Sequence, residues 1–218
     1  MIRVKICCIA NIEEAQTAIK LGASALGLVS EMPSGPGVID EKIITEVADS
    51  VPPGISTFLL TSKQTVDDII EQQKRCRTNT IQICDRLKNG AHLEIKKALP
   101  GIKIVQVVHV TGEESIEEAV EVSKKVDAIL LDSGNQNLKV KELGGTGRVH
   151  DWNISAEIRR KISVPMFLAG GLNPENVDEA IAMVKPYGVD ICSGVRTNGI
   201  LDEGKLKRFF ENIRNTQI

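Results

Sequence analysis

Two short glycine turns near the end of the chain have the composition of an anion-binding site. In the first, Gly170 and Gly171 follow the apolar run 166–169, and Asn173 and Pro174 then resemble the start of a helix. Main-chain N–H groups beside glycine can approach an anion closely, and a helix N-terminus adds the positive end of its dipole. We therefore expect this turn to bind a phosphate group.

The second turn, Ser193 and Gly194, ends the next apolar run, 189–193. Either turn alone is also typical of an ordinary connection between a strand and a helix. Two such turns after consecutive parallel strands favour a shared phosphate site over that ordinary connection. The residues predicted to bind phosphate are Gly170, Gly171, Asn173, Ser193 and Gly194.

Two residues could transfer protons, although their types alone are weak evidence. Asp132 ends the apolar run 128–131, so a desolvated carboxyl group there could act as a general acid or base. Cys7 lies beside Lys5 near the end of the first apolar run, and a thiolate there could accept a proton. A solvated aspartate in a turn and a small buried cysteine are the ordinary alternatives.

The three histidines do not form a ligand cluster, so we expect no bound metal. His109 ends the fifth apolar run, where an imidazole could donate a hydrogen bond to a ligand or simply end a strand. His92 falls in a predicted helix and is expected on the surface.

Eight apolar runs alternate with eight segments of helical spacing, which predicts parallel strands with crossover helices. The predicted strands are 3–8, 25–30, 55–60, 80–84, 103–110, 128–132, 166–169 and 189–193. The predicted helices are 12–21, 41–50, 65–75, 92–99, 113–124, 153–162, 174–184 and 203–212. Eight such units favour an α/β fold of the (β/α)8 TIM-barrel type, with one domain covering residues 1–218. An open doubly wound sheet is disfavoured, because Cys7 and Cys8 stand where its glycine-rich turn would be.

The composition and charge of the chain bear on its partners, its location and its disulfides. The formal net charge of −2 shows no basic excess, so we expect no nucleic-acid partner. No apolar run approaches the ~20 residues of a membrane span, and the chain starts on alternating apolar residues without a leader, so we expect a cytoplasmic protein with no membrane partner. The five cysteines are odd in number, which makes a disulfide framework unexpected.

Several segments together carry a resemblance to a known family. They are residues 5–7, 130–132, 144–147, 151–152, 168–177 and 193–195. In this order the chain resembles the phosphoribosylanthranilate isomerase family, barrel enzymes of tryptophan biosynthesis. The resemblance covers nearly the whole chain and is strongest in its last third.

The resemblance implies an Amadori rearrangement of a small phosphorylated sugar, from an aminoaldose phosphate to an aminoketose phosphate, without a metal or cofactor. It implies that Cys7 is the general base at C2 and that Asp132 is the general acid that opens the ribose ring. Lys5, His109, Gly145 and Arg148 are expected to contact the rest of the substrate. The oligomeric state stays open, with a homodimer as one alternative.

Three departures from the family pattern concern the aglycone end of the substrate. Cys8 replaces the usual glycine after the catalytic cysteine, and residues 82–85 read Gln-Ile-Cys-Asp instead of Gln-Leu-His-Gly. Residues 33–37 lack the arginine that holds the anthranilate group in the family. Arg148 or His109 could replace that arginine.

Two other functions therefore stay open. The chain could be a related isomerase that acts on a different phosphorylated sugar, or a barrel that binds a phosphorylated metabolite without catalysis. Retention of Cys7 and Asp132 argues against the second of these.

Overall fold

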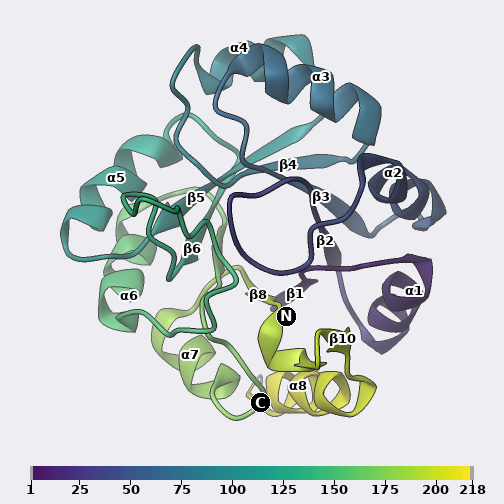
Figure 1. Ribbon diagram of the computed structural model, residues 1–218. Coiled ribbons are helices and arrows are strands. Elements are labelled where there is room, and N and C mark those ends of the chain that lie inside the picture. Colours follow the sequence, from purple (N-terminus) through teal and green to yellow (C-terminus); the bar gives the residue numbers. More distant parts are fainter. Residues whose placement is uncertain (1, 217–218) are drawn as a thin grey trace.

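The protein forms a closed barrel of eight parallel strands inside a ring of helices (Figure 1). The computed structural model describes residues 2–216. The strands are β1 (Arg3–Ile6), β2 (Ala25–Val29), β3 (Ser56–Thr61), β4 (Thr80–Ile83), β5 (Lys103–His109), β6 (Ala128–Asp132), β7 (Met166–Leu168) and β8 (Gly188–Ile191). They pair in chain order, and β1 closes the barrel against β8. This confirms the predicted barrel. Residue 1 and residues 217–218 of the predicted domain lie outside the described residues.

Each strand is followed by a helix on the outside of the barrel. The helices are α1 (Ile12–Leu21), α2 (Glu41–Ser50), α3 (Val66–Cys76), α4 (His92–Ala98), α5 (Glu114–Ser123), α6 (Trp152–Lys161), α7 (Val177–Val184) and α8 (Glu203–Thr216). Polar N-caps begin several of them; the Asn11 side chain, for example, accepts a hydrogen bond from the N–H of Glu14 at 2.9 Å. Within residues 2–216 no helix is long and apolar enough to cross a membrane.

The start of α7 differs from its predicted range, 174–184. The helix begins at Val177 with Asn176 as its N-cap residue, so Asn173 is not the N-cap. The reason is a separate turn before the helix, in which the Asn173 side chain accepts from the N–H of Glu175 and the Asn176 side chain accepts from the N–H of Asn173. The sequence analysis also missed the short helix η1 (Ser193–Val195) and the hairpin of β9 (Arg196–Thr197) and β10 (Ile200–Leu201).

Side chains along each strand alternate between two apolar layers, one between the barrel and the helices and one inside the barrel, and this alternation positions the site. On β6, Ile129 and Leu131 pack outward against the helices, whereas Leu130 faces the barrel interior. On β1, Val4 and Ile6 pack outward in the same way. Lys5, which lies between Val4 and Ile6, therefore faces the interior, and so does Asp132, two residues after Leu130. Each lies towards the C-terminal end of its strand.

Candidate active site

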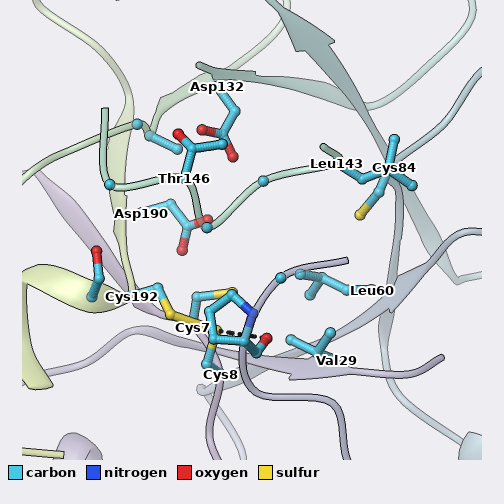
Figure 2. A pocket seen from close by; sticks show the side chains of 18 of the residues that line it. Cys7, Cys8, Val29, Leu60, Cys84, Asp132, Leu143, Thr146, Asp190 and Cys192 are labelled. Atoms are coloured by element: carbon cyan, nitrogen blue, oxygen red, sulfur yellow. Dashed lines mark hydrogen bonds between the residues drawn. A yellow bond between two sulfur atoms is a disulfide. The ribbon is translucent and has the colours of Figure 1, made fainter. Parts of the chain in front are cut away.

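A pocket lies at the C-terminal ends of the barrel strands (Figure 2). Its floor includes Cys7, Leu60, Gln82, Cys84, Asp132 and Asp190. Its roof includes Met32, Ser34, Gly35, Pro36, Leu143, Gly144, Gly145, Thr146 and Gly147, and one wall is formed by Ala169, Gly170, Gly171, Leu172, Ile191, Cys192 and Ser193.

The structure brings most of the predicted site residues to this pocket. The predicted residues that line it are Cys7, Asp132, Gly145, Gly170, Gly171 and Ser193. The predicted residues outside its lining are Lys5, His109, Arg148, Asn173 and Gly194. Gly194 and Asn173 contact one another beside the wall, because a Cβ on Gly194 would lie only 2.9 Å from the Cα of Asn173.

The two glycine turns lie against one another in this wall. Gly170 and Gly171 have φ values of +81° and +64°, which favour glycine. A Cβ on Gly171 would also lie 2.6 Å from the carbonyl carbon of Arg148, so the loop after β6 packs directly on this turn. Among the described residues, the main-chain N–H groups of Gly171, Ser193 and Gly194 donate no hydrogen bond to another protein group. They are available to an anion.

Cys7 and Asp190 point into the pocket from the neighbouring strand ends of β1 and β8 (Figure 2). Burial raises the pKa of the Cys7 thiol to about 11, and the nearby Lys5 ammonium opposes part of this rise. Asp190 also raises the pKa of Cys7, because its carboxylate repels a thiolate. Lys5 is therefore the cation that favours an ionised Cys7.

Lys5 lies beneath the pocket instead of contacting it. Its side chain is fully buried, and its Nζ lies 2.9 Å from Oδ1 of Asp190. Lys5 and Asp190 are register partners on adjacent strands, so both side chains point into the barrel at the same level. Gly27 makes room for them, because a Cβ at that position would lie 2.8 Å from the Cys7 Sγ and 2.9 Å from the Lys5 Nζ.

Asp132 lies across the pocket from Cys7 (Figure 2). Burial raises its pKa, while His109 and the hydrogen bond from the N–H of Ser133, at 2.7 Å, oppose the rise. A Cβ on Gly144 would lie 2.7 Å from Oδ2 of Asp132, so the loop after β6 passes directly over this carboxyl group. A raised pKa favours the protonated form, which is the form that can donate a proton.

The loops after β2 and β6 meet above the pocket. The hydroxyl of Ser34 donates to the carbonyl oxygen of Lys141 at 2.6 Å, and the Lys141 ammonium pairs with the buried carboxylate of Asp85. Pro36 also packs on Gly145, where a Cβ would lie 2.6 Å from the proline ring. These contacts tie the two loops to the end of β4 and form the roof.

Arg148 and His109 do not line the pocket, and His92 differs from its predicted position. Arg148 is an exposed side chain that pairs with Glu142 on its own loop and does not line the pocket. His109 is buried, with Nε2 3.1 Å from the carbonyl oxygen of Cys84, and does not line the pocket. His92, expected on the surface, is buried, and its Nε2 lies 2.9 Å from Oε1 of Gln106, because α4 packs against β5.

Comparison with known proteins assigns this barrel to a family. The family model for N-(5'-phosphoribosyl)anthranilate isomerase matches residues 4–212. The chain belongs to the phosphoribosylanthranilate isomerase family. It is 37% identical to the isomerase of Methanothrix thermoacetophila over 100% of both chains, and 36% identical to isomerase 2 of Methanosarcina mazei over 98% of this chain and 94% of that protein.

Solved structures of the family agree with the fold. The phosphoribosylanthranilate isomerase of Thermotoga maritima has a TM-score of 0.80 and 29% identity, covering 99% of this chain and 100% of that chain. A phosphoribosylanthranilate isomerase in complex with reduced 1-(o-carboxyphenylamino)-1-deoxyribulose 5-phosphate has a TM-score of 0.78 and 28% identity over the same shares of the two chains. The predicted membership of the phosphoribosylanthranilate isomerase family is thus confirmed.

Among residues 2–216, the side chains that line the pocket include acidic groups but no basic ones. Within the described part of the chain, no lysine, arginine or histidine side chain lines it, whereas two aspartates do. Neither of the predicted replacements for the missing family arginine, Arg148 and His109, reaches the lining. Lys141 contacts the loop where the family arginine is absent through its carbonyl oxygen, which accepts from the Ser34 hydroxyl, while its ammonium pairs with Asp85.

Cys8, where a phosphoribosylanthranilate isomerase usually has glycine, is bonded to Cys192. The sequence analysis did not predict this single bond, although the other three cysteines are free, as the absence of a disulfide framework implies. Closure of the barrel is the reason for the bond, because the ends of β1 and β8 become neighbours and the two Cα atoms lie 5.9 Å apart. Cys7, Cys76 and Cys84 are free and buried.

Sequence reasoning missed Asp190 and Cys192 as pocket residues of this isomerase. A charged residue between Val189 and Ile191 in a buried strand was the available signal for Asp190, since unpaired buried charge is costly. Cys192 had no such signal, because its role depends on a strand 184 residues away in the sequence. Residues 2–216 contain no group of three or more His, Cys, Asp or Glu side chains arranged to hold a metal ion.

Proposed function

We propose that this chain catalyses the isomerisation of N-(5'-phosphoribosyl)anthranilate to the corresponding aminoketose, a step of tryptophan biosynthesis. The observation that carries the proposal is the meeting of Cys7, Asp132 and the Gly170–Gly171 turn in one pocket of a barrel that belongs to this family. The reaction moves hydrogen within one molecule, so it has no net electron transfer and calls for no redox cofactor.

The phosphate of the substrate is assigned to the wall formed by the two glycine turns. The unpaired N–H groups of Gly171, Ser193 and Gly194 supply the donors. No lysine or arginine is needed at this end, because N–H groups at such turns can hold a phosphate on their own. Anchoring the phosphate positions the ribose carbons over the pocket floor.

Asp132 is assigned as the general acid. Its raised pKa favours a protonated carboxyl group, which can donate to the ring oxygen of the ribose as the C1–O bond breaks. The amine lone pair then forms the C1=N bond of the open-chain iminium. Loss of the C2 proton from this iminium gives an enolamine, which tautomerises to the aminoketose.

Cys7 is assigned as the base that removes the C2 proton. Even with the Lys5 ammonium beside it to favour the thiolate, a thiol with a pKa of about 11 is mostly protonated at neutral pH. The positive iminium formed at C1 favours the thiolate in the same way. Ring opening before proton removal therefore suits the charges of this pocket.

A second function is favoured by one observation, the absence of a cationic side chain from the pocket lining within residues 2–216. The anthranilate group carries a carboxylate, and a buried carboxylate without donors is costly. An isomerase acting on a phosphorylated sugar with an uncharged aglycone would not have this cost. The apolar side chains of Met32, Leu60 and Leu143 suit such a group.

One assay decides between these functions. The purified protein is mixed with phosphoribosylanthranilate, and the loss of its fluorescence is followed. A kcat/KM of ~10⁴ M⁻¹ s⁻¹ or more supports the anthranilate substrate, and a value several decades lower supports another phosphorylated sugar. Cys7→Ala and Asp132→Asn are the controls, since each should lower turnover by roughly 10² or more.

We also propose an oligomeric state and a location for the protein. A homodimer is the state to test, because a Thermotoga maritima relative is described as a dimeric phosphoribosylanthranilate isomerase. Light scattering separates it from the 23.7 kDa monomer. A cytoplasmic location is tested by cell fractionation.

A further inference from the structure

The Cys8–Cys192 disulfide lies in the pocket wall, and its two ends contact different parts of the site (Figure 2). Cys192 directly precedes Ser193 and Gly194, the second glycine turn. Cys8 directly follows Cys7 at the end of β1. The bond therefore joins the start of the proposed phosphate turn to the strand that carries the proposed base.

Cys8 also has a second partner. Its Sγ lies 3.7 Å from the carbonyl oxygen of Pro36 in the roof, and a Cβ on Gly37 would collide with the Cβ of Cys8. A disulfide sulfur has no proton to donate, whereas a thiol does. Breaking the disulfide would therefore give Cys8 a hydrogen bond to the roof in place of its bond to the phosphate turn.

The backbone at Cys8 supports a bonded state. Its φ is +61°, in the left-handed region that is unfavourable for residues other than glycine. Such a conformation persists where the surroundings enforce it. Two contacts do so here: the covalent bond to Cys192, and a hydrogen bond from the Arg196 guanidinium to the carbonyl oxygen of Cys8.

We propose that Cys8 and Cys192 form a redox site. When oxidised, a reversible disulfide fixes the phosphate turn to β1. When reduced, the Cys8 thiol instead donates a hydrogen bond to the roof. The partner in the reaction is a dithiol reductant small enough to enter the pocket. Cys192 is only half buried, whereas Cys8 is almost fully buried, so the reductant reaches the Cys192 sulfur.

The exchange balances as follows. A thiolate of the reductant attacks Sγ of Cys192, forms a mixed disulfide, and the electron pair of the old S–S bond leaves on Cys8, which takes up a proton. The second thiolate of the reductant then attacks the mixed disulfide and releases Cys192, which is also protonated. Two electrons and two protons pass from the dithiol to the protein, and the reductant leaves as a cyclic disulfide.

The first test counts thiols after equilibration of the whole protein with mixtures of reduced and oxidised dithiothreitol. After acid quenching, unfolding and alkylation, the oxidised protein should be alkylated only at Cys7, Cys76 and Cys84, the three free cysteines. Mass spectrometry should then find the peptides of Cys8 and Cys192 linked. The fully reduced protein should be alkylated at all five cysteines.

The second test measures amide hydrogen exchange and the binding of inorganic phosphate in both forms. Reduction should speed exchange in residues 192–195 and weaken phosphate binding several-fold. Cys192→Ser should behave as the reduced protein in every buffer. Cys76→Ala is the matched control, because Cys76 lies in α3 outside the pocket, and it should keep the full redox response.

Three results would overturn the proposal: alkylation of Cys8 and Cys192 in every mixture, linkage of either one to Cys7, or an unchanged redox response of exchange in Cys192→Ser. The phosphate measurement alone rests on the proposed function. Failure of both forms to bind phosphate would therefore count against the proposed phosphate site, while amide exchange and thiol counts still decide the redox site.

Discussion

The Nζ of Lys5 lies 2.9 Å from Oδ1 of Asp190, and both groups are beside the Cys7 thiol. The two neighbours act on Cys7 in opposite directions, since the ammonium lowers its pKa and the carboxylate raises it. The ion pair therefore sets how readily the proposed base ionises.

Lys5→Met should shift ionisation of Cys7 to higher pH and lower kcat/KM at neutral pH by roughly tenfold or more, because a shift of one pKa unit changes the thiolate fraction tenfold. Asp190→Asn should shift ionisation to lower pH. The measurement is the rate of Cys7 alkylation against pH, read from its peptide by mass spectrometry.

A double variant, Lys5→Met/Asp190→Asn, separates the effect of charge on Cys7 from the effect of altered packing in this experiment. The double variant leaves no unpaired charge in the barrel, so it should unfold less readily than Lys5→Met. It should still lack the cation that favours the thiolate. Alkylation profiles that coincide in the wild-type and Lys5→Met proteins would remove Lys5 from the mechanism.

Asp132→Asn should stabilise the protein while it lowers turnover. Burial raises the pKa of Asp132 above its unfolded value, so this group favours the folded state below the unfolded pKa, and that contribution is lost as pH rises through the folded pKa. At neutral pH the buried carboxyl group of Asp132 therefore lowers the free energy of unfolding relative to the neutral amide of asparagine. Thermal unfolding at pH 7 should show a higher Tm for Asp132→Asn than for the wild type, with a smaller difference at pH 4. A lower Tm at pH 7 would contradict this account of the site.

Gly171→Ala should weaken phosphate binding at least tenfold. The added Cβ would lie 2.6 Å from the carbonyl carbon of Arg148, so the turn has to move away from the pocket wall. Gly101→Ala is a matched control, because Gly101 also has a positive φ, +92°, but a Cβ there meets nothing within 4 Å. Calorimetric titration with inorganic phosphate should leave Gly101→Ala close to the wild type. Equal affinities of the two variants would argue against the assigned wall.

Ser34→Arg should lower KM for phosphoribosylanthranilate and leave phosphate affinity unchanged. Ser34 lines the roof, so an arginine there would supply the cation that the pocket lining lacks. The neighbouring Gly35 is a poorer position, because its φ of +103° would strain an arginine. Arg148→Ala should change KM less than twofold, since Arg148 is exposed and paired with Glu142. A large rise in KM for Arg148→Ala would show that the loop rearranges around the substrate.

Residues at strand ends were predictable from the sequence because alternation along a buried strand fixes which side chains face the interior. Cys7 and Asp132 line the pocket for this reason, and Gly170 and Gly171 follow from the end of the next strand. Their catalytic roles stay predictions. Lys5 shares the alternation of Cys7 but lies one step deeper, so it is buried.

Contacts that depend on loops or on closure of the barrel were not predictable. The direction of Arg148 is decided by its pairing with Glu142 six residues away on an irregular loop, which no periodicity describes. The bond between Cys8 and Cys192 and the pairing of Lys5 with Asp190 require β8 to meet β1. A local pattern contains no information on which distant strand supplies the partner.

The junction of β1 and β8 also constrains how the chain can assemble. Lys5 has its partner at Asp190, and the carbonyl oxygens of Cys7 and Cys8 accept hydrogen bonds from Arg196. During synthesis the first strand emerges long before these partners exist, so the burial of Lys5 is delayed until nearly the whole chain has been made. A nascent chain that stops before β8 therefore cannot bury Lys5 as an ion pair, and the pocket around Cys7 is completed only in the last stage of folding.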